Sequence, residues 1–399
     1  MSTWSAAVPL RYILSPREDT NHADLRVLSV YREYGVIPKD SREDNFNKTP
    51  IDLSRYQRVR VGDLVVNKMK AWQGSLGISD FVGIVSPDYL VCSVVKNIHG
   101  PYLHYLLRSS PLIAEYHKLA QGIRPAQWRI YWDDLARIRV DLPPIEYQRR
   151  VADFLEAETA RIDALITKKR CLMNVLRERF TAWLSGYLAT RTDEGIIPLK
   201  HCTDPARPIM YGIVLPGPDV DDGVLLVKGG DVKRNLIHPA VLAKTTYEID
   251  ALHARSRLRA DDLVFAIRGG VGDVALVPPD TTGANITQDV ARVSCDAKFS
   301  ARWLMHYMRT SHFQSDTNMR ITGATIKGLN IEDLKRLTVP LRRRNIQDGE
   351  AQIVDDRWQS VESVTNKLSR QLALLQEHRQ ALITAAVTGE LDIPAKSAG

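Results

Sequence analysis

The chain has 399 residues, of which 44% are hydrophobic and 25% are charged, and its formal net charge is +7. This length accommodates two domains with cores of their own, and the composition is typical of a soluble protein. No apolar run approaches the roughly 18 residues that a membrane span needs, so we expect no membrane association. The basic surplus suits a nucleic-acid partner, although it also fits a merely basic soluble protein.

The cysteines and the N-terminus indicate the compartment. Cys92, Cys171, Cys202 and Cys295 are far apart, and they form neither a CxxC pair nor a zinc-ligand spacing. Scattered cysteines are typical of a reducing compartment, and the first residues lack the basic-then-apolar pattern of a signal peptide. We therefore expect a cytoplasmic protein without a metal site.

Residues 1–142 are predicted to form a mixed globular domain. Short apolar runs predict strands at 27–30, 58–66, 81–85 and 90–95, one helix at 101–120 and a closing strand at 135–140. Polar stretches at 38–50 and 121–133 predict loops.

Residues 143–193 are predicted to form one long helix. Two prolines at 143–144 precede a stretch that lacks Pro and Gly until Gly186. Apolar residues recur in it at helical spacing: Val151, Leu155, Ile162, Leu165, Leu172, Leu176, Phe180 and Trp183. A helix of ~40 residues is roughly 60 Å long, which is more than a compact domain needs. The narrow apolar stripe favours a coiled-coil arm.

The second half of the chain repeats the first. Three pairs of identical residues in the long helices are 199 positions apart, and so are two pairs in the preceding domains: Gln148 and Gln347, Lys168 and Lys367, Leu176 and Leu375, Asp63 and Asp262, Leu64 and Leu263. Ser110 and Ser311 are 201 positions apart, so a gap of two residues opens and closes within the domain. A series of matches with one small gap indicates an internal repeat. It predicts strands at 224–227, 262–267, 274–277, 290–294 and 337–341, and a helix at 301–316.

We therefore predict an α+β fold with two repeated globular domains. Each domain is followed by a long helix, and the two helices pair with each other as a coiled coil. The predicted segments are a first domain at 1–142, a central helix at 143–193, a second domain at 194–341 and a C-terminal helix at 342–399.

The loops of the two copies differ where their cores agree. Residues 67–73 (NKMKAWQ) correspond to 266–272 (AIRGGVG), and residues 123–129 (IRPAQWR) correspond to 324–328 (ATIKG). One scaffold with two different surface loops is what two recognition specificities require.

In its long helices and in its domain order the chain resembles a known family, the DNA-specificity subunits of type I restriction-modification systems. The resemblance lies in the helix entry VDLPPIEYQ at 140–148, in the helix segments 152–155 and 162–166, and in the C-terminal segments 375–383 and 387–391. It covers essentially the whole chain through the order of domains and helices. One departure is that Leu341–Asn345 replaces the Pro-Pro entry before the second helix.

The resemblance implies a subunit without catalysis or a cofactor of its own. Each globular domain would be a target-recognition domain that reads one half of a split double-stranded DNA site. The helices would pair as an antiparallel coiled coil, set the distance between the half-sites and hold two adenine-methyltransferase subunits, which use S-adenosylmethionine. Restriction (motor-nuclease) subunits would join when restriction is needed.

The differing loops supply the residues that we expect to contact DNA. In the first copy they are Lys68, Lys70, Trp72, Gln73, Arg124, Gln127 and Arg129, and in the second copy Arg268, Arg320, Thr325 and Lys327. Arg and Lys suit guanine or phosphate, and Gln suits adenine. The plain alternative for any one of them is a solvated surface residue, and for the neighbouring Trp128 and Trp132 it is a core residue. On the first long helix, Phe154, Ile166 and Met173 are outer apolar positions that we expect to bind a partner subunit.

Two other classes of function stay open. The chain could be a single-chain DNA-modifying or DNA-cleaving enzyme with two recognition domains, or a coiled-coil scaffold that does not bind DNA. No His/Cys metal spacing or Ser-His-Asp set supports an enzyme. The glycine-rich stretch 269–273 lacks the Lys-Ser/Thr ending of a phosphate loop, so we interpret it as a tight loop.

Overall fold

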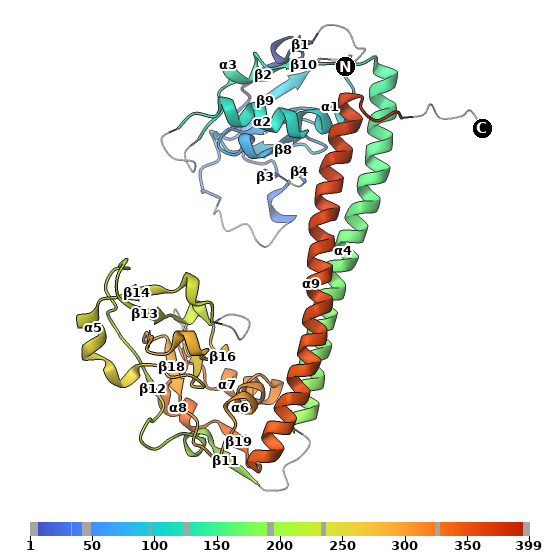
Figure 1. Cartoon of the computed structure of the whole chain (residues 1–399). Coiled ribbons are helices and arrows are strands. Elements are labelled where there is room, and N and C mark those ends of the chain that lie inside the picture. The colour runs from blue at the N-terminus through green and yellow to red at the C-terminus, as the bar shows by residue number, and fades with distance from the viewer. Residues whose placement is uncertain are drawn as a thin grey trace. The chain divides into compact units, whose positions relative to one another are not determined.

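The structure is a computed structural model that describes residues 7–32, 34–41, 49–95, 97–122, 128–189, 195–232, 237–323 and 328–393. The chain divides into two compact units, unit 1 with residues 1–169 and 369–399 and unit 2 with residues 170–368. The division runs through both long helices, so each helix contributes one segment to each unit (Figure 1).

Unit 1 is built on a four-stranded antiparallel sheet in the order β2-β9-β6-β7. Its globular elements are β1 (Val8–Pro9), β2 (Leu14–Arg17), β3 (Leu28–Tyr31), β4 (Gly35–Pro38), β5 (Gln57–Val59), β6 (Leu64–Asn67), β7 (Leu76–Ile78), β8 (Gly83–Val85), β9 (Tyr89–Val94), α1 (Gly100–Leu107), α2 (Ser110–Leu119), α3 (Trp132–Leu135) and β10 (Arg139–Val140). Strands β3 and β4 pair with each other, as do β5 with β8 and β1 with β10.

Unit 2 has the corresponding sheet in the order β12-β18-β15-β16. Its elements are β11 (Ile196–Pro198), β12 (Met210–Tyr211), β13 (Val224–Val227), β14 (Ala243–Thr245), α5 (Tyr247–Leu252), β15 (Leu263–Ala266), β16 (Val274–Leu276), β17 (Asn285–Ile286), β18 (Val290–Val293), α6 (Ala301–Met308), α7 (Ser311–Met319), α8 (Ile331–Arg336) and β19 (Thr338–Pro340). A second sheet, β14-β13-β17, packs beside the first.

The strand register confirms the internal repeat. In unit 1, Leu64 on β6 lies opposite Cys92 on β9. In unit 2, Leu263 on β15 lies opposite Val293 on β18. The first residues of these pairs are 199 positions apart and the second residues are 201 apart, so the two-residue gap lies between these strands. The two units therefore share one sheet architecture, as the sequence predicts.

The long helices are α4 (Ile145–Ala189) and α9 (Arg344–Thr388), of 45 residues each, and both their ends are 199 positions apart. The carbonyl of Pro144 accepts hydrogen bonds from two amides of the first turn of α4, and Arg343 does the same for α9. The arginines that replace the Pro-Pro entry therefore leave the helix start in place. Gly389, with φ 76°, ends α9 because a left-handed residue without a side chain stops a helix at low cost.

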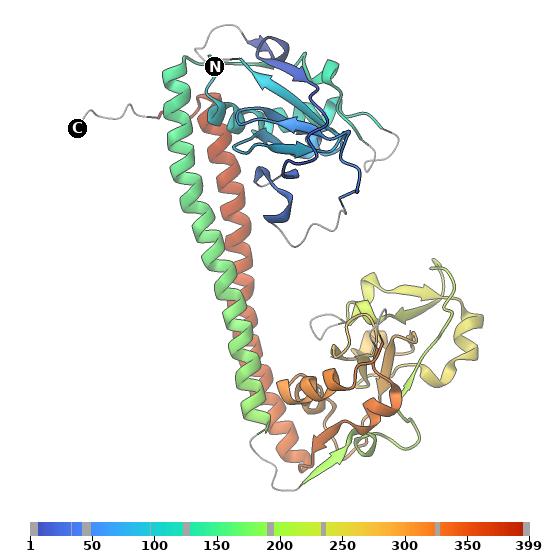
Figure 2. The same ribbon diagram turned by 180° about the vertical axis from the view of Figure 1, so that it is seen from behind.

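Within each unit the two helix segments lie side by side and run antiparallel (Figures 1 and 2). In unit 1, Asp163 pairs with Arg379, and Lys169 bonds Gln371 further along. In unit 2, the Phe180 and Trp358 rings are 4.9 Å apart, and Arg342 donates to the Leu188 carbonyl. Residue numbers rise along α4 while they fall along α9, so the predicted antiparallel pairing is confirmed in both units.

Four secondary-structure predictions were wrong in detail. The single helices predicted at 101–120 and 301–316 are each two helices, α1 and α2 in unit 1 and α6 and α7 in unit 2. The breaks come before Ser110 and Ser311, where Ser109 and Thr310 take extended backbone angles and a new helix starts. The strand predicted at 135–140 is shorter: α3 ends at Leu135, after Asp133 and Asp134 in its helical first turn, and only Arg139–Val140 form a strand, β10. The strand predicted at 58–66 is two strands, β5 and β6, which pair with different partners.

Candidate nucleic-acid interface

The loop that follows β6 presents the first group of predicted DNA contacts. It passes through a short 3-10 helix at Ala71–Gln73 and ends at Gly74, whose φ is 88°. A side chain at Gly74 would also come within 2.9 Å of Ile113, so this turn needs glycine. The Asn67 side chain accepts a hydrogen bond from the Met69 amide and fixes the start of the loop.

The side chains of this loop have different environments. Lys68 is half-buried, and its ammonium donates to the Pro87 carbonyl at 2.7 Å. Lys70 is exposed and Gln73 is half-buried. Trp72 packs against the unit 1 core and donates its ring N–H to the Met69 carbonyl at 2.9 Å. The loop therefore offers Lys70 and Gln73 to a ligand more freely than Lys68 or Trp72.

Three aromatic rings pack together at this loop. Trp72, Trp128 and His117 meet edge to face, with ring centroids 5.2 Å apart for the two tryptophans and 5.7 and 5.1 Å apart for their contacts with His117. Edge-to-face packing favours a fixed geometry. Trp132, at the start of α3, is half-buried against the core.

The structure brings Arg129, from the second predicted group of unit 1, close to the loop of the first group. The Ile130 amide donates to the Lys68 carbonyl at 2.9 Å, and Arg129 pairs with Gln121 through two backbone hydrogen bonds. The guanidinium of Arg129 reaches Asp88, in the loop before β9, at 3.2 Å. Arg124 and Gln127 lie outside the described residues.

Unit 2 joins its loops by the same hydrogen bond. The Leu329 amide donates to the Ile267 carbonyl at 2.9 Å, and both residues are 199 positions after their counterparts in unit 1. Arg268 is exposed, and its guanidinium donates to the Gln288 side chain at 3.1 Å. Arg320, at the end of α7, lies 4.0 Å from Asp316. Thr325 and Lys327 lie outside the described residues.

The glycine-rich stretch of unit 2 is a tight turn between β15 and β16. Gly269, Gly270 and Gly272 have φ values of 69°, 152° and 102°. The Gln314 side chain donates to the Gly272 carbonyl at 2.8 Å, and a side chain at Gly272 would come within 2.3 Å of it. No helix follows the turn, so it has the tight-loop form that the sequence indicates and not that of a phosphate loop.

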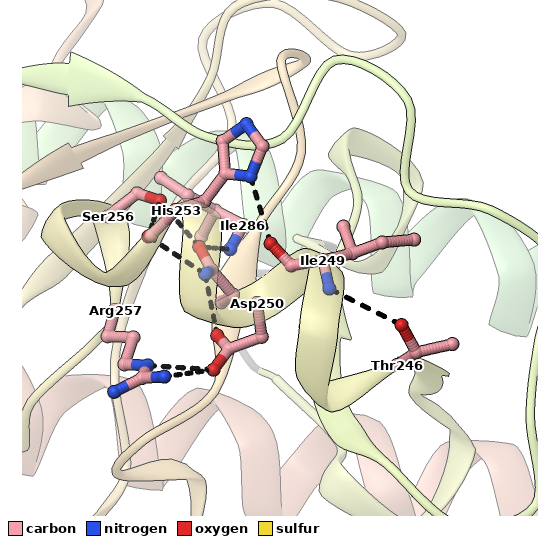
Figure 3. Close-up of polar contacts among 8 residues, drawn as sticks. Thr246, Ile249, Asp250, His253, Ser256, Arg257 and Ile286 are labelled. Carbon is pink, nitrogen blue, oxygen red and sulfur yellow. Dashed lines mark hydrogen bonds and ion pairs between the residues drawn. The ribbon is translucent and has the colours of Figure 1, made fainter.

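A buried polar network in unit 2 fixes the strand that leads to Gln288 (Figure 3). Asn285, on β17, donates to Asp250 at 2.8 Å and accepts from Ser256 at 2.7 Å and from the Ile286 amide at 2.9 Å. Asp250 also accepts from Arg257. Because buried groups that are all paired stabilise one geometry, this network is structural. Sequence reasoning missed both the network and Gln288, since no local pattern marks them.

The predicted partner-binding residues lie along α4. Ile166 is only 7% exposed, and Phe154 packs half-buried against the unit 1 core. Contacts within the chain therefore account for both side chains, and their binding to a partner stays a prediction. Met173 is half-buried. On the same helix, Leu165 and Leu172 are 47% and 45% exposed, which sequence periodicity did not distinguish from the buried stripe.

The described part of the chain holds no cluster of three or more His, Cys, Asp or Glu side chains that could bind a metal ion. Within the same ranges, neither the long helices nor any other helix is both long and apolar enough to cross a membrane.

Comparison with known proteins shows one similar curated sequence over part of the chain. No protein-family model matches the chain. The chain is 25% identical over 274 residues to the type I restriction enzyme EcoBI specificity subunit of Escherichia coli, a match that covers 63% of this chain and 58% of that protein. The chain resembles the type I specificity subunits. The matched region spans just over half the length of the E. coli subunit.

One solved structure shares the fold of this chain, and a second was also compared with it. One chain, from work on the "complex assembly and conformational transition of the type I R-M system", has a TM-score of 0.71 at 16% identity, over 98% of this chain and 99% of that chain. The HsdS subunit from Thermoanaerobacter tengcongensis has a TM-score of 0.48 at 16% identity, over 97% of each chain. The first likeness confirms the predicted fold class of two α+β domains and two long helices.

Proposed function

We propose that this chain is the DNA-specificity subunit of a type I restriction-modification system. One observation carries the proposal: the same hydrogen bond joins the same two loops in both units, yet the side chains on the loops differ. The bond runs from Ile130 to Lys68 in unit 1 and from Leu329 to Ile267 in unit 2. A shared scaffold with different side chains suits two domains that read two different half-sites.

The chemistry of the loops suits double-stranded DNA. Lys70 in unit 1 and Arg268 in unit 2 are exposed cations, and Arg129 in unit 1 is partly exposed. Such cations bind phosphates or the acceptor edge of guanine, whereas Gln73 suits adenine. About half of such contacts go to phosphates, and these give affinity and not sequence information.

The helices supply the surface for the partners. The repeat implies two equivalent positions, and we infer that one adenine-methyltransferase subunit occupies each. The exposed Leu165 and Leu172 on α4 offer apolar area for that contact. The chain itself is non-catalytic, S-adenosylmethionine belongs to the methyltransferase, and restriction subunits join the same complex.

The test is a selection from random double-stranded DNA with the chain co-purified with its methyltransferase. The expected result is a split motif, with two defined halves around an undefined spacer. A continuous motif or no enrichment would contradict the proposal. Methylation by the isolated chain would instead favour the single-chain enzyme, and a stable complex without DNA affinity would favour the scaffold.

A further inference from the structure

Two aspartates occupy the same position in the two units, beside the loops of the candidate interface. Asp88 comes directly before β9, and Asp289 comes directly before β18. They are 201 positions apart, and so are Cys92 and Val293, the equivalent residues of those two strands. The repeat thus places an acidic residue at the edge of each set of basic loops.

Each aspartate holds the loop after the central strand through its backbone. The Asp88 carbonyl accepts from the Lys68 amide at 3.1 Å, and the Asp289 carbonyl accepts from the Ile267 amide at 2.8 Å. Asp289 also accepts from the Arg268 amide at 3.2 Å. These bonds fix where each carboxylate stands relative to the loops.

Each carboxylate faces an arginine that the sequence predicts to contact DNA. Asp88 lies 3.2 Å from the guanidinium of Arg129, and Asp289 lies 3.9 Å from that of Arg268. The two arginines come from different loops, Arg129 from the stretch before α3 and Arg268 from the turn after β15. The aspartate therefore stands at the equivalent position in both units, while the arginine that it faces comes from a different loop in each.

Stability does not explain these pairs. The side chains are 39% and 54% exposed for Arg129 and Asp88, and 46% and 42% exposed for Arg268 and Asp289. Ion pairs that are so exposed contribute little to folding. A carboxylate beside a DNA-binding loop also repels phosphates and lowers affinity for any sequence. An acid that weakens binding and adds little stability is explained when it improves discrimination.

We propose that Asp88 and Asp289 are specificity-determining positioning residues, one for each half-site. Asp88 accepts a hydrogen bond from the Arg129 guanidinium, and Asp289 attracts the Arg268 guanidinium across 3.9 Å. Each carboxylate thereby keeps its guanidinium away from the phosphates. The remaining N–H groups of the arginine are then directed to a base edge. This inference rests on the proposed function, because it assigns a role within the two reading surfaces.

The experiment uses the full chain in complex with its methyltransferase. Asp88→Asn and Asp289→Asn are each made alone, and the methylated sites of a host genome are sequenced. Asp88→Asn should relax one base position in one half-site, with the ratio of motif to off-motif methylation falling about tenfold, and should leave the other half-site intact. Asp289→Asn should do the same for the opposite half. Affinity for non-specific DNA should rise in both variants.

The control is Asp40→Asn, which removes the carboxylate of another exposed pair in unit 1, Arg26–Asp40 at 2.7 Å. It should leave both half-sites unchanged. Unaltered selectivity in both aspartate variants would overturn the inference, and so would equal loss at both half-sites or a lowered melting temperature with an unchanged motif. If the wild-type complex gives no split motif, the proposed function itself fails, and that result is distinct from these.

Discussion

Gln148 makes the same two hydrogen bonds in unit 1 that Gln347 makes in unit 2. The Gln148 side chain accepts from the His99 amide at 3.0 Å and donates to the Pro143 carbonyl at 2.8 Å. Gln347 accepts from the Ser300 amide at 2.7 Å and donates to the Arg342 carbonyl at 2.8 Å. Each glutamine thus joins the first turn of a long helix to the domain that precedes it.

Replacing either glutamine should weaken the connection between the long helix and its domain and so destabilise the protein. We expect Gln148→Ala to lower the free energy of unfolding by about 1–3 kcal/mol, because a buried amide and a buried carbonyl lose their partner. Gln347→Ala should have a similar effect. Urea unfolding measures both. The matched control is Gln352→Ala, at an exposed position of α9, which should change stability by less than about 0.5 kcal/mol. Equal losses of stability in all three variants would show that the hydrogen bonds of Gln148 and Gln347 contribute no more than those of an exposed glutamine.

The pH dependence of stability tests the environment of His104. Burial, and then the charges of Arg108 and Arg379, lower the pKa of His104 to about 3. The unfolded histidine titrates near ~6.5, so between these values the unfolded state binds the proton more readily. The stabilisation is complete above the unfolded pKa and is lost as the pH falls below it, by at most ~1.4 kcal/mol per pH unit.

Unfolding in urea at pH 7 and pH 5 measures this effect. His104→Gln should be less sensitive to the lower pH than the wild type. Some dependence should remain, because burial also lowers the pKa of His306 in unit 2. An identical pH dependence in both proteins would show that His104 titrates normally in the folded chain.

Salt dependence separates phosphate contacts from base contacts. We expect Lys70→Ala to weaken binding about equally for all sequences and to reduce the slope of log K against log salt by about 1, since an exposed lysine suits a phosphate. The control is Lys118→Ala, an exposed lysine paired with Glu115 on α2. A change of the preferred sequence in Lys70→Ala would instead assign this lysine to a base.

The length of the helices should set the spacer of the site. Inserting four helix-forming residues after both Lys168 and Lys367 lengthens α4 and α9 by roughly 6 Å each, and DNA rises about 3.4 Å per base pair. Four residues are about one turn, so the apolar stripe stays close to register. The methylated motif should keep both halves and gain roughly one or two base pairs of spacer. Two inserted residues rotate the stripe by roughly 200° and should abolish activity. An unchanged spacer in an active complex would contradict the role of the helices.

The features that the sequence predicts well are those that a local pattern determines. Repeated identities at one separation located both helices, and the matched residues Asp63 and Asp262 located both central strands. The break before Ser110 was missed because Leu106, Leu107 and Ile113 continue a helical spacing across it. Asp88 and Gln288 were missed because their partners, Arg129 and Arg268, are far away in the sequence or in a different loop. Which loops meet depends on strand order, which periodicity does not give.

The most direct test of two separate reading surfaces is the methylation motif of a host that carries the complex. It is determined by genome sequencing for the wild type, for Arg129→Ala and for Arg268→Ala. We expect a split motif in the wild type. Each variant should lose discrimination at one position of one half only, at a cost of about 1–3 kcal/mol, and the two variants should affect opposite halves. A motif that changes in the same half in both variants, or in both halves in either one, would contradict it.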